Sequence, residues 1–96
     1  MYATVRRYEG ITDTIEAGRR VKEEFVPIIS QIPGFIAYYW VDAGGGVMIS
    51  TGVYQNKAAA EESNRKAEEW IQQAAVTLYP NPPLITAGEV VAHSAK

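Results

Sequence analysis

The segment from Asn56 to about Leu78 contains the side chains best suited to a binding site. Alanines on one face of the predicted helix would leave space over a sheet, while Asn64 offers an amide and Trp70 an aromatic wall with one N–H donor. At about 100° per residue, this face holds Ala60, Ser63, Asn64, Ala67, Trp70, Ile71, Ala74 and Leu78. Small, polar and aromatic side chains together can outline a small-molecule pocket. The alternative is that the same residues pack as core.

A second candidate is His93, which would share one strand face with Glu89 and could form a proton-transfer pair with it. Its position near the end of the chain favours an ordinary exposed residue instead. Gly44–Gly46 lies between two predicted strands rather than before a helix, which argues against a phosphate or dinucleotide loop. One histidine without cysteine or clustered carboxylates does not predict a metal site. We therefore expect neither a metal nor another cofactor.

The composition excludes several classes of protein. Hydrophobic residues make up 47% of the 96 residues and charged residues 21%, as in ordinary globular proteins, and the length suits one domain spanning residues 1–96. The net charge of -2 gives no basic surface for nucleic acid. Without cysteine there is no disulfide and no thiolate nucleophile. No stretch reaches the roughly 20 apolar residues of a membrane helix, so we expect a cytoplasmic protein without membrane association.

Hydrophobic patterning predicts the element order βαββαβ, which is that of an α+β ferredoxin-like domain with an antiparallel sheet. Strands are expected at 2–8, 35–42, 47–54 and 84–93, and helices at 13–32 and 56–78. Asp13 and Asn56 are candidate N-caps, and Pro27 predicts a kink or an early loosening of the helix because it has no N–H. Gly88 predicts a bulge or a close backbone approach in the last strand. The buried face of the first helix is expected to hold Ile15, Gly18, Val21, Phe25, Ile28, Ile29 and Ile32. RNA-binding modules share this order, but the third strand lacks their basic and aromatic pattern.

The second predicted strand indicates self-association. It contains an unbroken apolar run from Phe35 to Val41. Because successive strand side chains point to opposite faces, such a run predicts a strand that is covered on both sides. The chain's own helices can cover one side. We expect a second copy of the chain on the other, giving a homodimer through the sheet.

Three stretches of the sequence carry a family resemblance. They are Pro27–Phe35 with its Pro-Gly-Phe turn, Glu61–Trp70 with its terminal tryptophan, and Gly88–Val90. Together they resemble the antibiotic biosynthesis monooxygenase family of dimeric α+β barrels, over nearly the whole chain. That family includes oxygenases of aromatic polyketides that use no metal or flavin, haem-degrading enzymes and small isomerases. The haem-degrading branch needs an asparagine on the first strand and a histidine on the second helix, and this sequence has neither there.

The resemblance implies a function as well as a fold. It suggests an oxygenase that needs no cofactor and acts on a small aromatic molecule such as a phenol or anthrone. Asn64 would donate a hydrogen bond to an enolate oxygen, and Trp70 would form the pocket wall. The base would be His93 or Glu89, or the substrate would ionise through its own acidity without a protein base. The candidate catalytic residues are thus Asn64, Trp70 and His93, and the candidate substrate-binding residues are Ser63, Ala67, Tyr54 and Phe25. The alternative is a non-catalytic dimer that binds a small ligand or stabilises an assembly.

Overall fold

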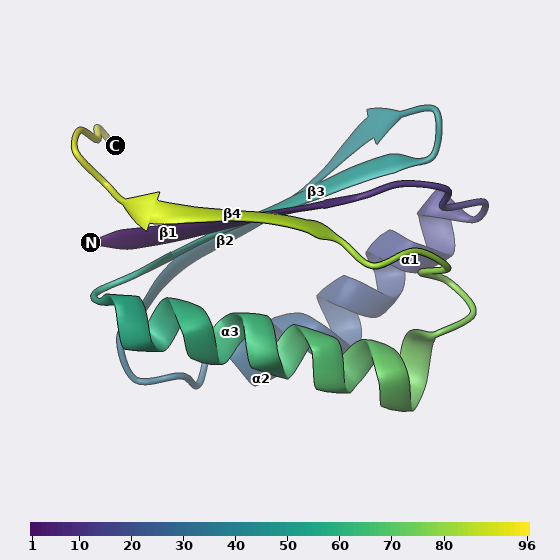
Figure 1. Ribbon diagram of the computed structural model, residues 1–96, viewed down its shortest axis with the longest axis horizontal. Helices are drawn as coiled ribbons and strands as arrows, with labels where there is room; N and C mark the ends of the chain where they lie inside the picture. The colour runs from purple at the N-terminus through teal and green to yellow at the C-terminus, as the bar shows by residue number, and fades with distance from the viewer.

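The computed structural model describes residues 1–96 as a four-stranded antiparallel sheet with helices packed on one face (Figure 1). The elements are β1 (Tyr2–Tyr8), α1 (Thr14–Arg20), η1 (Val21–Phe25), α2 (Val26–Ile29), β2 (Phe35–Gly44), β3 (Val47–Tyr54), α3 (Lys57–Trp70), η2 (Ile71–Ala75) and β4 (Leu84–Glu89), where η denotes a π-helical turn. The strands lie side by side in the order β2-β3-β1-β4. This is the predicted ferredoxin-like α+β fold.

The first helix widens just before Pro27. There the Val26 N–H bonds to the Val21 carbonyl, five residues back rather than four. Pro27 has no N–H to continue the regular ladder, and the π-helical turn accommodates it where a kink was predicted. The extra residue rotates the start of the helix relative to its end, so Ala17 is buried in place of Ile15. The prediction that Ile15 belongs to the core is wrong, because this side chain is 86% exposed.

The element boundaries differ from the predicted ones mainly at the C-terminal ends. Both helices begin directly after the predicted caps, Asp13 and Asn56, whose side-chain oxygens accept N–H groups of the first turn. The helical segments end earlier than predicted, at residues 29 and 75, β2 continues to residue 44, and β4 stops at Glu89. Gly88 pairs with Ala3 without a register shift, so the predicted bulge is absent. None of the helices has the length and apolar character that crossing a membrane requires.

The sheet face that meets the helices carries the core. Along β1, Thr4, Arg6 and Tyr8 fall on this face because strand side chains repeat every two residues, and all three are at most 3% exposed. They pack with side chains of the helices and of β3. The larger members of this core are Tyr8, Val21, Phe25, Ile29, Ile32, Met48, Tyr54, Trp70 and Tyr79.

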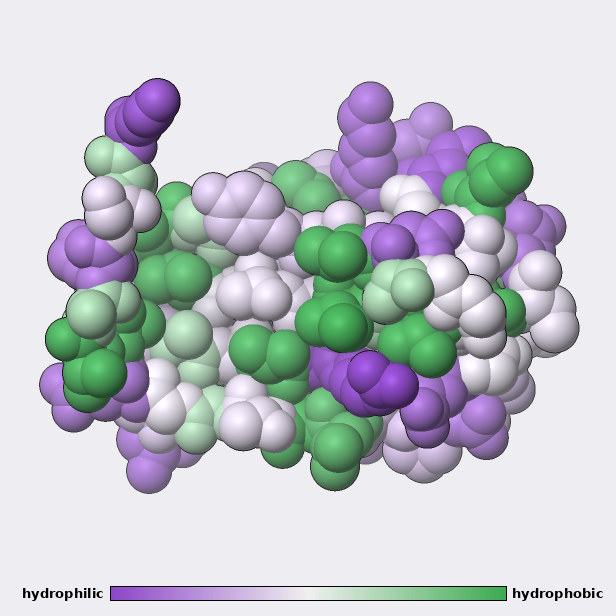
Figure 2. Space-filling view, turned by 90° about the horizontal axis from the view of Figure 1, so that it is seen from above, coloured by the Kyte–Doolittle hydropathy of each residue, from purple (hydrophilic) through white to green (hydrophobic).

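No helix covers the opposite face of the sheet (Figure 1). Its exposed apolar side chains include Tyr39 at 62%, Val41 at 47% and Leu84 at 69% exposure. Figure 2 looks onto this face and shows hydrophobic residues across its middle. The strand register adds Val5, Ile49 and other residues of β1 and β3 to the same face. Tyr39 and Val41, from the run that was expected to meet a second copy of the chain, therefore lie on one open surface with apolar residues of the other strands.

Candidate ligand-binding site

A cavity of about 600 Å³ opens between the sheet, the end of the second helix and the loop that leads into β4. This volume falls within the range of about 300–1,000 Å³ that small-molecule sites occupy. The Asn81 side chain donates to the Glu9 carbonyl at 3.1 Å and ties the loop to the end of β1. The cavity is lined by Arg6, Tyr8, Asn64, Arg65, Ala67, Glu68, Ile71, Gln72, Val76, Tyr79, Pro80, Asn81, Pro82, Pro83 and Ile85.

Asn64 is oriented by two hydrogen bonds from β1. Its Oδ1 accepts from Arg6 Nη1 at 2.7 Å and from Thr4 Oγ1 at 3.1 Å. The amide oxygen is therefore occupied, whereas the two N–H groups have no acceptor within the protein. They can donate to an oxygen atom of a ligand in the cavity. This orientation suits the donor role that the family resemblance implies for Asn64.

Arg6 is a buried cation without a carboxylate partner. Arg6 is only 2% exposed, and its guanidinium takes part in none of the ion pairs of the molecule. The guanidinium lies 5.6 Å from the centre of the Phe25 ring, and its Nε has no hydrogen-bond partner. Buried charges are normally paired, because removing them from water is costly. The wall of the cavity therefore carries an uncompensated positive charge.

Two tyrosines give this wall an aromatic surface. The ring centres of Tyr8 and Tyr79 are 5.2 Å apart, and the Tyr79 hydroxyl donates to the Ala17 carbonyl at 3.2 Å. Burial raises the pKa of both phenols, although the neighbouring Arg6 partly offsets the effect on the pKa of Tyr8. Both phenols stay protonated near neutral pH, so neither can serve as a general base.

Trp70 lies behind this wall rather than on it. Its ring packs against Phe25 at 5.3 Å and against Tyr79 at 5.9 Å between centres, and only Tyr79 of the three also lines the large cavity. The indole N–H donates to Glu24 Oε1 at 3.2 Å. Phe25 and Trp70 border a space of only about 10 Å³, too small for an organic ligand. Both residues support the cavity through their packing and do not line it.

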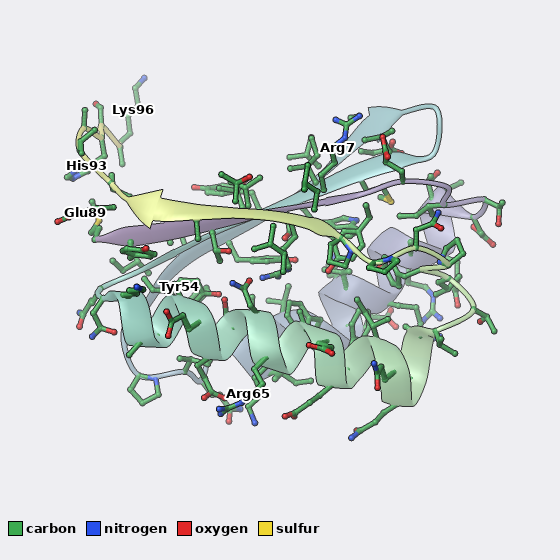
Figure 3. All side chains as sticks on the ribbon, in the orientation of Figure 1. Arg7, Tyr54, Arg65, Glu89, His93 and Lys96 are labelled. Atoms are coloured by element: carbon green, nitrogen blue, oxygen red, sulfur yellow. The ribbon has the colours of Figure 1, made fainter.

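The other predicted site residues fall in three places. Asn64 and Ala67 line the cavity. Ser63 and Tyr54 are fully buried elsewhere in the core, where the Ser63 hydroxyl donates to a carbonyl of its own helix at 2.7 Å. His93 is exposed beyond the end of β4, and Figure 3 shows it with Glu89 at the end of the sheet where the chain termini lie. The structure thus brings Asn64 and Ala67 together and leaves His93 outside.

The sequence interpretation missed Arg6, the two tyrosines and the loop Pro80–Pro83. A signal for Arg6 existed, because a charged residue between Thr4 and Tyr8 on one strand face is unusual in a core. The opposite face of the same strand also carries an arginine, Arg7, so alternation alone does not tell which of the two is buried.

Structural comparison identifies several proteins with a similar fold. NE2512, a protein of unknown function from Nitrosomonas europaea, aligns with a TM-score of 0.78 at 18% identity, over 99% of this chain and 93% of that chain. The monooxygenase ActVA-Orf6 of Streptomyces coelicolor, solved with nanaomycin D, aligns with a TM-score of 0.74 at 14% identity, over 99% and 91%. SnoaB, a cofactor-independent oxygenase from Streptomyces nogalater solved as a mutant, aligns with a TM-score of 0.74 at 10% identity, over 99% and 97%.

Sequence comparison adds nothing to this, because no protein-family model and no curated protein matches the chain. At identities this low, structural similarity establishes the fold and leaves the activity open. The resemblance in the sequence and the structural neighbours nevertheless agree with each other. The chain has the α+β fold of the antibiotic biosynthesis monooxygenase-like proteins.

Proposed function

We propose that this chain is a cofactor-independent oxygenase that acts on a small aromatic molecule with a phenol or enol group, bound beside Asn64. The observation that carries the proposal is the cavity of about 600 Å³, in which Arg6 and the Asn64 amide meet aromatic and apolar walls. The fold supports it, because ActVA-Orf6 is described as a monooxygenase and SnoaB as a cofactor-independent oxygenase.

In the proposed reaction the substrate supplies the electrons. A phenol or anthrone loses a proton, its carbanion transfers one electron to dioxygen, and the two radicals combine to form a C–O bond. The peroxide is protonated and then loses water, so that a CH₂ group becomes a carbonyl and the second oxygen atom leaves as water. Asn64 would donate to the substrate oxygen on which negative charge develops. The apolar walls would keep bulk water from the reactive carbanion.

In the proposed reaction no side chain of the cavity acts as the base: the substrate ionises through its own acidity, and its proton passes to solvent water. No histidine lines the cavity, and the one carboxylate in its lining, Glu68, is exposed to solvent. His93 and Glu89, the other candidates, lie at the end of β4 outside the lining. The positive charge of Arg6 and the N–H groups of Asn64 both favour an ionised substrate, because they interact more strongly with an anion than with the neutral molecule.

We further propose that two copies of the chain associate through the open face of the sheet. This face carries exposed Tyr39, Val41 and Leu84 and is crossed by hydrophobic residues (Figure 2). Covering such a surface with the same surface of a second copy removes apolar area from water in a closed, symmetric arrangement. The cavity lies on the helix side of the sheet and would remain accessible.

A small-molecule binding protein without catalytic activity is the second candidate. The position of Trp70 favours it, because this residue supports the wall and does not face the cavity. The absence of an acid–base pair from the lining is also consistent with binding alone. The same aromatic ligands would then bind beside Asn64 without consuming oxygen.

Oxygen uptake distinguishes the two candidates. Anthrone-like and quinol substrates are added to metal-free protein, to Asn64→Asp and to Gln73→Glu. The first variant keeps an acceptor for Arg6 but removes the N–H donors, and the second makes the same kind of change at an exposed residue outside the cavity. Uptake that is lost only in Asn64→Asp supports the oxygenase. Ligand binding without uptake supports the binding protein, and equal uptake by all three proteins contradicts the role of Asn64.

A further inference from the structure

The groups that face Arg6 are neutral on every element packed against it. On β1 and β2 they are the phenols of Tyr8 and Tyr38, on η1 the ring of Phe25, and on α3 the amide of Asn64. On β3 and β4 they are Ser50 and Ile85, which pair with Arg6 in the sheet. Both phenols are protonated at neutral pH, and burial raises their pKa further above it, in the case of Tyr38 to about 12. None of these groups compensates the charge of the guanidinium, which is therefore available to a ligand.

The charged residues at the rim of the cavity do not supply that compensation either. Arg65 pairs with Glu62, and Figure 3 shows Arg65 on the side of α3 that is turned away from the sheet. Glu68 is exposed and forms no ion pair with Arg6. The cavity thus offers a cation and two amide N–H donors, and the two phenols in its lining, on Tyr8 and Tyr79, are neutral.

We infer that the cavity binds its ligand as an anion, an aromatic molecule whose negatively charged oxygen lies against Arg6 and the Asn64 amide. This inference rests on the proposed function for the location of the ligand, but it concerns binding and requires no reaction. A phenolate or enolate would give the buried guanidinium the counter-charge that the chain does not provide. Charge-assisted hydrogen bonds are roughly twice as strong as neutral ones, so the anion should bind in preference to the neutral form.

The competing explanation is that Arg6 is only a structural residue, held by the Phe25 ring and the Asn64 oxygen. Under that explanation the arginine contributes to the stability of the fold but does not distinguish an anionic from a neutral ligand. The two explanations therefore differ in ligand selectivity, which can be measured without any catalytic turnover.

The test compares para-nitrophenol, which ionises near neutral pH and changes its absorption when it does, with para-nitroanisole, a methyl ether of similar shape that cannot ionise. Calorimetric titration of the whole protein gives both affinities, and the absorption spectrum reports how much of the bound nitrophenol is ionised. We expect the anion to bind about tenfold or more tightly than the ether. Arg6→Met should abolish this preference, and Arg6→Lys should retain part of it.

The spectrum of the ligand bound to the unmodified protein needs no variant, so the test holds even where Arg6→Met fails to fold. We expect the bound nitrophenol to be ionised at a lower pH than the free molecule. Equal affinity for the two ligands, a preference that survives in Arg6→Met, or binding of neither ligand overturns the inference. A preference for the anion in a protein that consumes no oxygen supports the inference and overturns only the oxygenase proposal.

Discussion

Replacing Asn64 by alanine should destabilise the protein through Arg6. The change removes the oxygen that accepts from Arg6 at 2.7 Å and from Thr4 at 3.1 Å. A hydrogen bond from a charged donor contributes about 1.5–3 kcal/mol and one from a hydroxyl about 0.5–1.5 kcal/mol. Because both hydrogen bonds are only partly buried, we expect a loss in the lower part of the summed range, about 2–3 kcal/mol.

The matched control is Asn64→Asp, which keeps an acceptor oxygen and adds a negative charge opposite Arg6. Urea unfolding followed by tryptophan fluorescence, at one protein concentration, gives the free energies of unfolding. For a chain of this size the alanine variant should lose roughly 10–20 °C in Tm, while the aspartate variant should equal or exceed the unmodified protein near neutral pH. A loss below about 0.5 kcal/mol for alanine, within the usual range of surface substitutions, or an equal loss for aspartate, would refute the dependence of Arg6 on Asn64.

Three further predictions concern the assembly, the pH dependence and the hairpin. Ile49→Glu, on the open sheet face, should convert a dimer into a monomer in sedimentation experiments. Ile15→Glu, at an 86% exposed site on the helix side, should leave the dimer intact. If the unmodified protein is itself a monomer, the proposed dimer is contradicted. Burial raises the pKa of Tyr38 from 10.0 to about 12, so the unfolded state loses this proton first, and the free energy of unfolding should decline as the pH rises through that interval. Tyr38→Phe should show a smaller decline in urea titrations. An identical decline in both proteins refutes the assignment of this pKa to Tyr38. Gly45→Ala should lower the stability of the fold by about 1–2 kcal/mol, because the backbone at this residue is left-handed. Gly46→Ala should lower it further in thermal unfolding, because the added Cβ would also lie 2.7 Å from a backbone oxygen. Equal losses of stability in the two variants contradict this close approach.

Much of the fold could be predicted from local signals. Asp13 and Asn56 are N-caps in the structure as in the sequence, because a short polar side chain before an apolar run satisfies free N–H groups at a helix start. The strands at 2–8 and 47–54 have their predicted bounds. The π-helical turn before Pro27 could not be placed, since a helical wheel assumes a constant rotation per residue. That assumption produced the error at Ile15.

The candidate site was less accessible to sequence reasoning, because it is formed by contacts between distant segments. Helix periodicity placed Asn64 and Ala67 on the inner face, and both line the cavity. The same periodicity cannot tell whether an inner residue borders a cavity or lies behind one, which is why Trp70 was assigned to the wall. Arg6 became recognisable only when the structure showed which face of β1 is buried and that no carboxylate reaches it.

The fate of dioxygen tests the proposed oxygenase activity most directly. Metal-free protein and an anthrone-like substrate are incubated under isotopically labelled dioxygen, with Asn64→Asp as the comparison, and the product is examined by mass spectrometry. We predict that each product molecule carries one labelled oxygen atom and that Asn64→Asp forms product no faster than the uncatalysed reaction. Product without label, or labelled product formed equally fast by Asn64→Asp, would contradict an oxygenase that acts on a substrate held beside Asn64.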